Sequence, residues 1–222
     1  MDTTKLIGLQ LRTASKVSLS DGFDLSDINR VGGIDQAVVS NTVISALVVL
    51  EYPSLKKLYE TTVEQEASFP YVPTFLSFRE GPPAVEAYRK AENERWAVDI
   101  LLVDGCGVNH PRRSGLASYI GVELDLPTIG VSKSRLCEEY DDDAVPKEAG
   151  VSSAFNCSGV FSGYLYKSRG GCRPLFIAPG HMVSPATCIE VASTCMSGSK
   201  MPEPLRAAHA LAKRRQALLS SP

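Results

Sequence analysis

A short apolar run that ends abruptly on an acid is the feature that most constrains how this chain can fold. Residues 100–103 read Ile-Leu-Leu-Val, and Asp104 follows them directly, before the Gly-Cys-Gly loop at 105–107. Four consecutive apolar residues bounded by turn-forming residues predict a strand that is buried on both faces of a sheet. A carboxylate at the C-terminal end of such a strand lies where open α/β sheets usually place their ligand sites. Taken alone, the same residues fit an Asp-Gly turn between a strand and a helix equally well.

Bulk properties fix the broad class of protein. The 222 residues are enough for one sizeable core without disulfides, and we expect a single domain over residues 1–222. The net charge of −2 means that any nucleic-acid binding must come from a local basic patch. The six cysteines lack metal-site spacing, which indicates free thiols. No signal peptide or apolar run of about 20 residues is evident, so we expect an intracellular protein.

Three strand patterns precede the central run. They cover residues 29–39, 42–52 and 55–66, and Asp35 lies inside the first of them. Because no helical pattern separates them, they predict an antiparallel meander.

A proline-braced segment follows the meander. Residues 69–73 read Phe-Pro-Tyr-Val-Pro, and two prolines hold the backbone extended, which predicts a rigid loop with Tyr71 at its tip. A turn whose tyrosine packs on the core fits these residues equally well. We expect Thr74 to cap the next helix and Gly81-Pro82-Pro83 to interrupt it.

The second half of the chain alternates helix and strand patterns. Residues 127–132 predict a buried strand that delivers Lys133 and Arg135 to the side of Asp104. The acidic residues 138–143 are interpreted as a solvated loop that opens a polar segment reaching about residue 156. The remaining patterns are helices at 5–20, 114–122, 184–195 and from 202 onward, a strand hairpin at 158–166 and 174–178, and a turn at 179–181.

Three carboxylates lie in comparable contexts, namely Asp35, Glu80 and Asp104. Acids inside or at the end of apolar strands are costly to bury unless a cation or a network of donors neutralises them. Oxygen ligands suit Mg²⁺ or Mn²⁺, and such an ion can assist the displacement at a phosphodiester. The alternative is that each acid caps a helix or pairs with an arginine such as Arg30 or Arg79.

The histidines are weaker signals. His209 has Arg206 and Lys213 on the same face of the last helical pattern, and that face could meet a phosphate or accept a proton. An ordinary amphipathic helix gives the same pattern. We interpret His181 as structural.

Six sequence strings occur in the order typical of one nuclease family. They are VGGID, FPYVPTFLSFREGP, LLVDGCGVNHPRRSGLAS, LPTIGVSKSRL, PLFIAPGHMVS and MPEPLRAAHALA, and they span from about residue 31 to 213. In these strings the chain resembles endonuclease V. The resemblance implies a ribonuclease H-like fold of the α/β class, with a mixed central β-sheet whose first three strands are antiparallel and which helices flank.

The resemblance also implies an activity. It implies an Mg²⁺-dependent endonuclease, in which Mn²⁺ is expected to substitute, that recognises inosine and other deaminated purines in DNA or RNA. The family cuts the second phosphodiester bond 3′ of the lesion and leaves 3′-hydroxyl and 5′-phosphate ends. The implied role is nucleic-acid repair or the processing of inosine-containing RNA, by a protein that we expect to act as a monomer and away from membranes.

The matching motifs assign catalytic roles to five residues of this chain. Asp35 and Asp104 match the principal metal-binding acids, and Glu80 matches the third acid of the metal site. Lys133 matches a lysine near the substrate phosphate, and His209 matches a residue near the metal. The resemblance therefore implies one catalytic centre built from these five side chains.

The same match assigns residues to substrate binding. A rigid aromatic tip suits the wedge that fills the gap left by a flipped base, and here the wedge matches Pro70, Tyr71, Val72 and Pro73. The pocket for the extruded base matches Leu76, Gly105, Gly107 and His110. Phosphate binding is expected from Arg112 and Lys133, and basic groups such as residues 213–215 could add phosphate contacts.

Two departures from the family pattern bear on substrate preference. Gln36-Ala37-Val38 follows Asp35, and Cys106 lies between the pocket glycines. Two other hypotheses stay open, a non-catalytic inosine-binding protein and a structure-specific nuclease of the same fold. The intact acids argue against the first, because binding alone needs no metal centre and would survive chelation.

Overall fold

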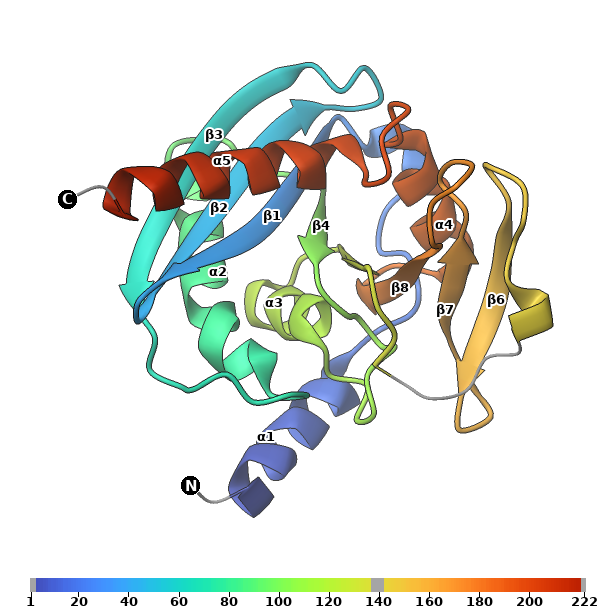
Figure 1. The fold of residues 1–222 in the computed structure, drawn as a ribbon, viewed down its shortest axis with the longest axis horizontal. Coiled ribbons are helices and arrows are strands. Elements are labelled where there is room, and N and C mark those ends of the chain that lie inside the picture. Colours follow the sequence, from blue (N-terminus) through green and yellow to red (C-terminus); the bar gives the residue numbers. More distant parts are fainter. Residues whose placement is uncertain (1–2, 137–141, 221–222) are drawn as a thin grey trace.

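A computed structural model describes residues 3–136 and 142–220 of the chain, and its centre is one mixed sheet. Within these residues the sheet has eight strands in the order β3-β2-β1-β4-β5-β8-β7-β6 (Figure 1). The strands are β1 (Arg30–Val39), β2 (Thr42–Glu51), β3 (Lys57–Glu66), β4 (Ile100–Asp104), β5 (Thr128–Ser132), β6 (Ser152–Cys157), β7 (Val160–Tyr166) and β8 (Leu175–His181).

The pairing of the strands confirms the predicted meander and the mixed sheet. Strands β1, β2 and β3 are antiparallel, whereas β4 pairs in parallel with both β1 and β5. In the register of β1 and β4, Ile34 is paired with Val103. The next residues along the two strands, Asp35 and Asp104, therefore lie side by side.

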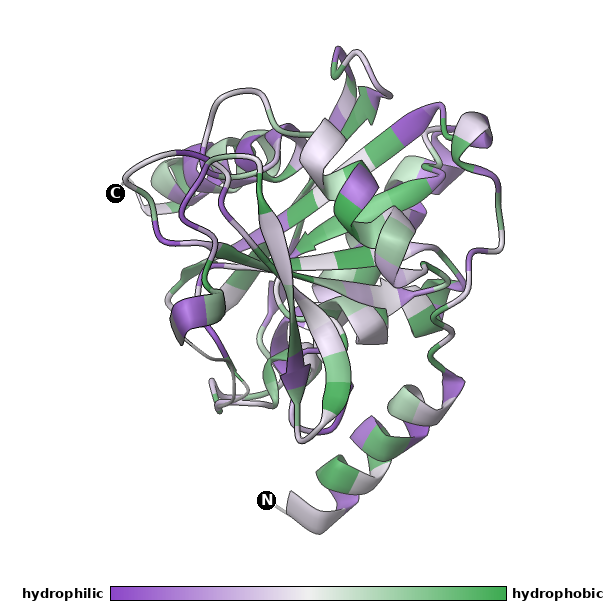
Figure 2. Cartoon of the chain, turned by 90° about the vertical axis from the view of Figure 1, so that its right-hand side faces the viewer, coloured by the Kyte–Doolittle hydropathy of each residue, from purple (hydrophilic) through white to green (hydrophobic). Residues whose placement is uncertain are grey.

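Helices cover both faces of the sheet. Strand β4 is buried on both sides, because Leu102 packs among residues of α4 and α5, and Leu101 packs among residues of α2 and α3. Apolar residues gather along the strands in the middle of the molecule (Figure 2), and α1 projects away from them (Figures 1 and 2). The helices are α1 (Thr3–Lys16), α2 (Leu76–Asn93), α3 (Leu116–Leu124), α4 (Pro185–Thr194) and α5 (Glu203–Ser220), with 3₁₀ turns η1 (Leu25–Asp27) and η2 (Asp142–Ala144).

Helix α2 differs from the sequence-based expectation at both of its special positions. Gly81-Pro82-Pro83 does not interrupt the helix, which runs unbroken from Leu76 to Asn93. The close packing of this segment offsets the lost backbone donors, since Gly81 and Pro83 are buried and a Cβ on Gly81 would lie 2.4 Å from the Tyr119 ring. The expected cap by Thr74 was also wrong: the helix begins after Phe75, without a side-chain hydrogen bond at its N-cap.

The region of β6 to β8 also departs from the sequence-based prediction. The polar segment reaching residue 156 contains the edge strand β6, in which only Phe155 is buried, so hydrophobic patterning did not reveal it. The turn predicted at residues 179–181 is the buried end of β8. Pro179 is tolerated there because the pairing with β5 shifts register between Thr128 and Ile129. The acidic run at 138–143 lies partly outside the described residues.

Two simpler expectations concern the whole chain. Across the described ranges, no helix is both long and apolar enough to cross a membrane. Cys137 is not described. The described cysteines are free thiols, namely Cys106, Cys157, Cys172, Cys188 and Cys195.

Candidate active site

Three carboxylates from three different elements face one another beside the end of β4. Strand pairing brings Asp35 next to Asp104, and Glu80 joins them from the second turn of α2. Burial, and then the negative charge of Asp35, raise the pKa of Glu80 to about 7, with Arg79 opposing the shift and Asp104 adding to it. The structure thus brings together the three acids that the sequence singled out.

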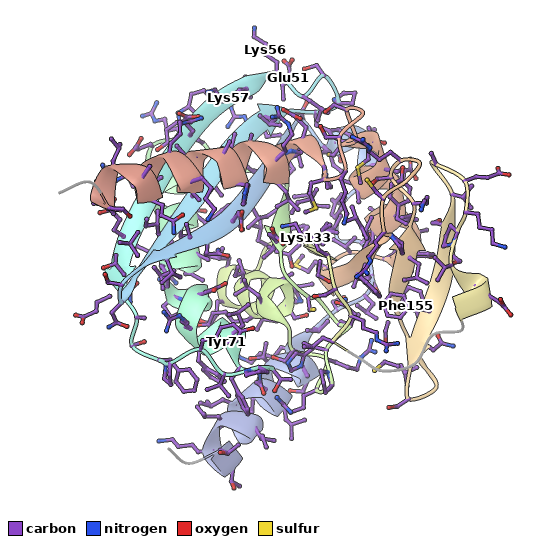
Figure 3. The ribbon with its side chains drawn as sticks, in the orientation of Figure 1. Glu51, Lys56, Lys57, Tyr71, Lys133 and Phe155 are labelled. Carbon is purple, nitrogen blue, oxygen red and sulfur yellow. The ribbon has the colours of Figure 1, made fainter. Side chains whose placement is uncertain are left out.

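Two nitrogen-bearing side chains complete this acid centre. Lys133 Nζ donates a hydrogen bond to Asp104 Oδ2 at 2.6 Å, and His209 Nδ1 lies 2.7 Å from Asp35 Oδ2. Burial raises the pKa of Asp104, and the charge of Asp35 adds to this, while Lys133 lowers it. All five residues predicted for the catalytic centre therefore lie together, and in Figure 3 Lys133 lies in the middle of the face shown.

His209 reaches Asp35 because α5 approaches β1 very closely. A Cβ on Gly33 would lie 2.2 Å from the carbonyl of Pro204, so only glycine allows this approach. The helix crosses the sheet in front of β1 and β2 (Figure 1) and presents His209 at its second turn.

The alternative explanation of the acids as partners of nearby arginines is not what the structure shows. Arg79 Nη1 donates to the carbonyl of Phe69 at 2.8 Å. Arg30 Nη1 donates to the carbonyl of Arg95 at 3.1 Å, and its guanidinium lies over the ring of Trp96. Within the described part of the chain, neither arginine forms an ion pair with the acid centre.

A cavity of about 300 Å³ opens directly on the acid centre. Asp104 and Lys133 line it together with Tyr71 and three of the four residues predicted for a base pocket, Leu76, Gly105 and His110. Gly107, the fourth, is not among its lining residues. Its role is packing, because a Cβ there would lie 2.1 Å from the carbonyl oxygen of Pro179 in β8.

His110 and Arg112 hold the wall of this cavity. His110 Nε2 lies 2.9 Å from the carbonyl oxygen of Thr74, and burial lowers the pKa of His110 to about 4, so the imidazole is neutral and donates this hydrogen bond. Arg112 donates to the hydroxyl of Thr74 at 2.7 Å and also to the Gln10 side chain in α1. Arg112, predicted to bind phosphate, thus joins α1 to the loop before α2 in this structure.

Tyr71 lies at the rim of the cavity with 70% of its surface exposed, so it does not pack on the core. Figure 3 shows it on the side of the molecule where α1 lies. The loop is fixed at its base, where Phe69 contacts the Phe78 ring at 5.8 Å between centroids. Of the two interpretations of the proline-braced segment, the exposed aromatic tip is the one that the structure shows.

Sequence reasoning missed several polar residues of the site. Gln10 donates to the Thr74 carbonyl at 2.6 Å across a separation of 64 residues, for which no local pattern exists. Ser132 lines the cavity opposite Cys106, with 3.8 Å between Oγ and Sγ. Burial raises the pKa of Cys106 to about 11, so it contributes a neutral thiol to the wall.

The acids have the donor chemistry of a site for a hard divalent cation. Carboxylate oxygens are the ligands that Mg²⁺ and Mn²⁺ prefer, and burial together with the charge of Asp35 raises the pKa of Glu80, so a bound cation would favour its ionised form. Among the described residues no three Asp, Glu, His or Cys side chains are already arranged as a cage, and the nitrogen-bearing side chains that contact these acids are Lys133 and His209.

The sheet and the acid centre together define a class of protein. An antiparallel three-strand unit continued by two parallel strands, with acids on neighbouring strands and helices on both faces, is the arrangement of a ribonuclease H-like fold.

Comparison with known proteins identifies the family. The Endonuclease V family profile matches residues 11–210, and the chain belongs to the endonuclease V family of endonucleases. It is 39% identical over 213 residues to Endonuclease V of Archaeoglobus fulgidus, covering 96% of this chain and 93% of that protein. The catalytic domain of human Endonuclease V superposes with a TM-score of 0.90 at 30% identity, covering 99% of this chain and 98% of that one.

A further solved structure shows a relative with nucleic acid. Ciona intestinalis Endonuclease V, in complex with a 24mer DNA containing an inosine followed by a ribo-adenosine, superposes with a TM-score of 0.87. It is 26% identical, and 98% of each chain is covered. These similarities confirm the ribonuclease H-like fold expected from the sequence.

Proposed function

We propose that this protein is a divalent-metal-dependent endonuclease that cuts inosine-containing DNA or RNA at the second phosphodiester bond 3′ of the inosine. The observation that carries this proposal is the cavity of about 300 Å³ that Asp104 and Lys133 share with Leu76 and His110. A base in the cavity would place its own strand beside the acid centre. The Ciona intestinalis relative with inosine-containing DNA supports the choice of base.

The cavity suits an extruded purine base. Leu76 gives it an apolar wall, and His110, held neutral by burial, gives it a polar group without a charge. Tyr71 at the rim is free to stack in the gap that the extruded base leaves in a duplex. In this proposal, Pro70 to Pro73 form the wedge, and Leu76, Gly105 and His110 contact the base.

The acid centre suits hydrolysis of a phosphodiester. Lys133 is a half-exposed cation beside Asp104, so it can stabilise the negative charge that develops on the phosphate. In the metal-free protein the pKa of Glu80 is about 7, so binding of the metal ion near neutral pH would release a proton from this carboxyl. Asp35 orients the His209 imidazole through the 2.7 Å contact. Mg²⁺, held by Asp35, Glu80 and Asp104, would neutralise phosphate charge and activate water, and Mn²⁺ shares its ligand preference.

The experiment that tests this function is cleavage of matched single-stranded DNA and RNA oligonucleotides. Each carries one internal inosine, and the controls carry guanosine or adenosine at the same position. With Mg²⁺ we expect one cut, at the second linkage 3′ of the inosine, with 3′-hydroxyl and 5′-phosphate ends. With a chelator we expect no cut, because the three carboxylates would lack their counter-ion.

Each contrary outcome points to a defined alternative. Tight inosine binding without cleavage under any metal would overturn the nuclease proposal in favour of an inosine-binding protein. Cleavage that is indifferent to inosine but selective for flaps or mismatches would favour a structure-specific nuclease. The comparison of the two sugars shows whether DNA or RNA is the preferred substrate.

A further inference from the structure

A second cavity, of about 390 Å³, adjoins the first one. The two share a wall, because Lys133 and Ser134 line both of them. On the far side of this wall the second cavity is lined by Arg135, Arg173 and Phe176. In Figure 3, Tyr71 at the first cavity, Lys133 and Phe155 on β6 all lie on the face shown, and Lys133 is nearest its middle.

The second cavity is cationic. Three of its lining residues are Lys133, Arg135 and Arg173, and none of the described residues that line it is acidic. Arg173 is exposed, and among the described residues its side chain has neither a hydrogen bond nor an ion pair. Its planar guanidinium is therefore available for the paired hydrogen bonds that it forms with phosphate oxygens.

The backbone that carries Arg173 is well fixed. Lys167 Nζ donates to the carbonyl of Cys172 across the turn between β7 and β8, at 2.5 Å. Pro174 follows directly and restricts the chain before β8 begins at Leu175. Phe176 is buried and meets the Phe155 ring edge-on at 5.8 Å. A cation on a rigid support suits a binding subsite better than a freely moving surface charge.

We infer that this second cavity is a phosphate subsite for the part of the strand that continues 3′ of the cleaved bond, with Arg173 as its main contact. The inference rests on the proposed function, because the subsite is assigned from the order in which the substrate strand would contact the base cavity, the acid centre and the second cavity. The base in the first cavity precedes the cut, and the cut lies at Asp104 and Lys133. The strand that passes beyond Lys133 then meets Arg135 and Arg173.

The test compares three variants on inosine-containing single strands. Arg173→Gln removes the charge, Arg173→Lys keeps it, and Arg169→Gln removes the same charge from the neighbouring turn, outside both cavities. Binding is measured with chelator present, and cleavage is measured with Mg²⁺. The oligonucleotides carry a neutral methylphosphonate in turn at each linkage 3′ of the cleaved bond.

We expect Arg173→Gln to weaken binding about three- to fivefold, the scale of one exposed ion pair, and Arg173→Lys to recover part of the loss. The slope of log affinity against log salt should become shallower by about 0.7, as expected for one lost phosphate contact with a single strand. For the wild-type protein, a methylphosphonate at one position should weaken binding by a similar factor. With that oligonucleotide, Arg173→Gln should weaken binding no further, because the contact is already lost.

Two kinds of failure can be told apart. If wild-type protein does not select inosine at all, the proposed function fails. If wild type cuts at inosine but Arg173→Gln behaves like Arg169→Gln, or loses equally at every methylphosphonate position, the phosphate subsite is wrong and the proposed function stands.

Discussion

The acid centre and the Tyr71 loop border the same cavity but are held in opposite ways. Asp35 and Asp104 lie on paired strands, and Asp35 is only 7% exposed. Tyr71 lies on a loop between regular elements and is 70% exposed. The base of the loop is anchored, because Arg79 donates a hydrogen bond to the Phe69 carbonyl and the Phe69 ring contacts Phe78. The tip of the loop stays outside the core.

This difference separates the residues proposed for catalysis from those proposed for substrate binding. Groups that must hold a fixed geometry lie on strands and helices, where packing sets their positions. The aromatic ring proposed to contact nucleic acid lies on an exposed loop whose base is fixed. We therefore expect substitutions in the acid centre to change turnover and substitutions in the loop to change binding.

The largest effect is expected for Asp104→Ala. It removes a central acid and leaves Lys133 without its partner, so turnover on inosine-containing strands should fall by on the order of 10³-fold or more. Binding should stay detectable, because the cavity and the loop remain. Single-turnover cleavage and gel-shift titration measure the two separately, with Asp24→Ala as an exposed control. Retained turnover would contradict the placement of the acid centre.

Glu80→Gln is expected to stabilise the protein while disabling it. Burial and the charge of Asp35 raise the pKa of Glu80 from 4.5 to about 7, so the folded state is penalised wherever this carboxyl must ionise. The penalty is absent below pH 4.5, grows as the pH rises towards 7, and reaches about 3 kcal/mol at pH 8, which Glu80→Gln would relieve.

Denaturant unfolding at pH 8 and pH 4.5 in chelator measures this effect. Glu86→Gln, an exposed position on the same helix, is the control and should change little at either pH. Equal stability of wild type and Glu80→Gln at pH 8 would mean that burial and the neighbouring acids do not disfavour the ionised form of Glu80.

Local patterns were sufficient to predict the strands that carry Asp35 and Asp104. The run at 100–103 is apolar because both faces of β4 are covered, and this double burial also makes Asp104 stand out. His209 was harder, since its contact with Asp35 depends on how α5 crosses β1. The prediction that His209 lies in the catalytic centre came from the family motif and not from the helical pattern.

The contacts that the sequence could not reveal join distant segments. Gln10, Thr74 and Arg112 form one hydrogen-bonded group across separations of 64 and 102 residues, and each of these residue types is common on surfaces. Strand β6 stayed hidden because an exposed edge strand lacks an apolar face. Long-range packing and pairing, rather than propensity, decide such features.

Tyr71→Ala should change binding with little effect on the chemical step. Loss of a ring that stacks in the gap of a duplex should weaken binding to duplex inosine DNA about tenfold, in the range of one base-stacking contact. Binding to single-stranded inosine DNA should weaken less, because no partner strand leaves a gap. Tyr71→Phe keeps the ring and should behave as wild type. Equal losses on both substrates would count against a wedge.

The smallest effect is expected at the basic end of α5, where the sequence alone suggested phosphate contacts. Arg214 pairs with Glu60 at 3.4 Å and Arg215 pairs with Glu64, so acids of β3 already neutralise both arginines. The double variant Arg214→Gln, Arg215→Gln should change affinity for inosine-containing strands less than about twofold and leave the salt slope unchanged. A slope shallower by more than one unit would mean that these arginines leave their acids for phosphate. The surface that binds nucleic acid would then extend from the cavity rim across the sheet to α5.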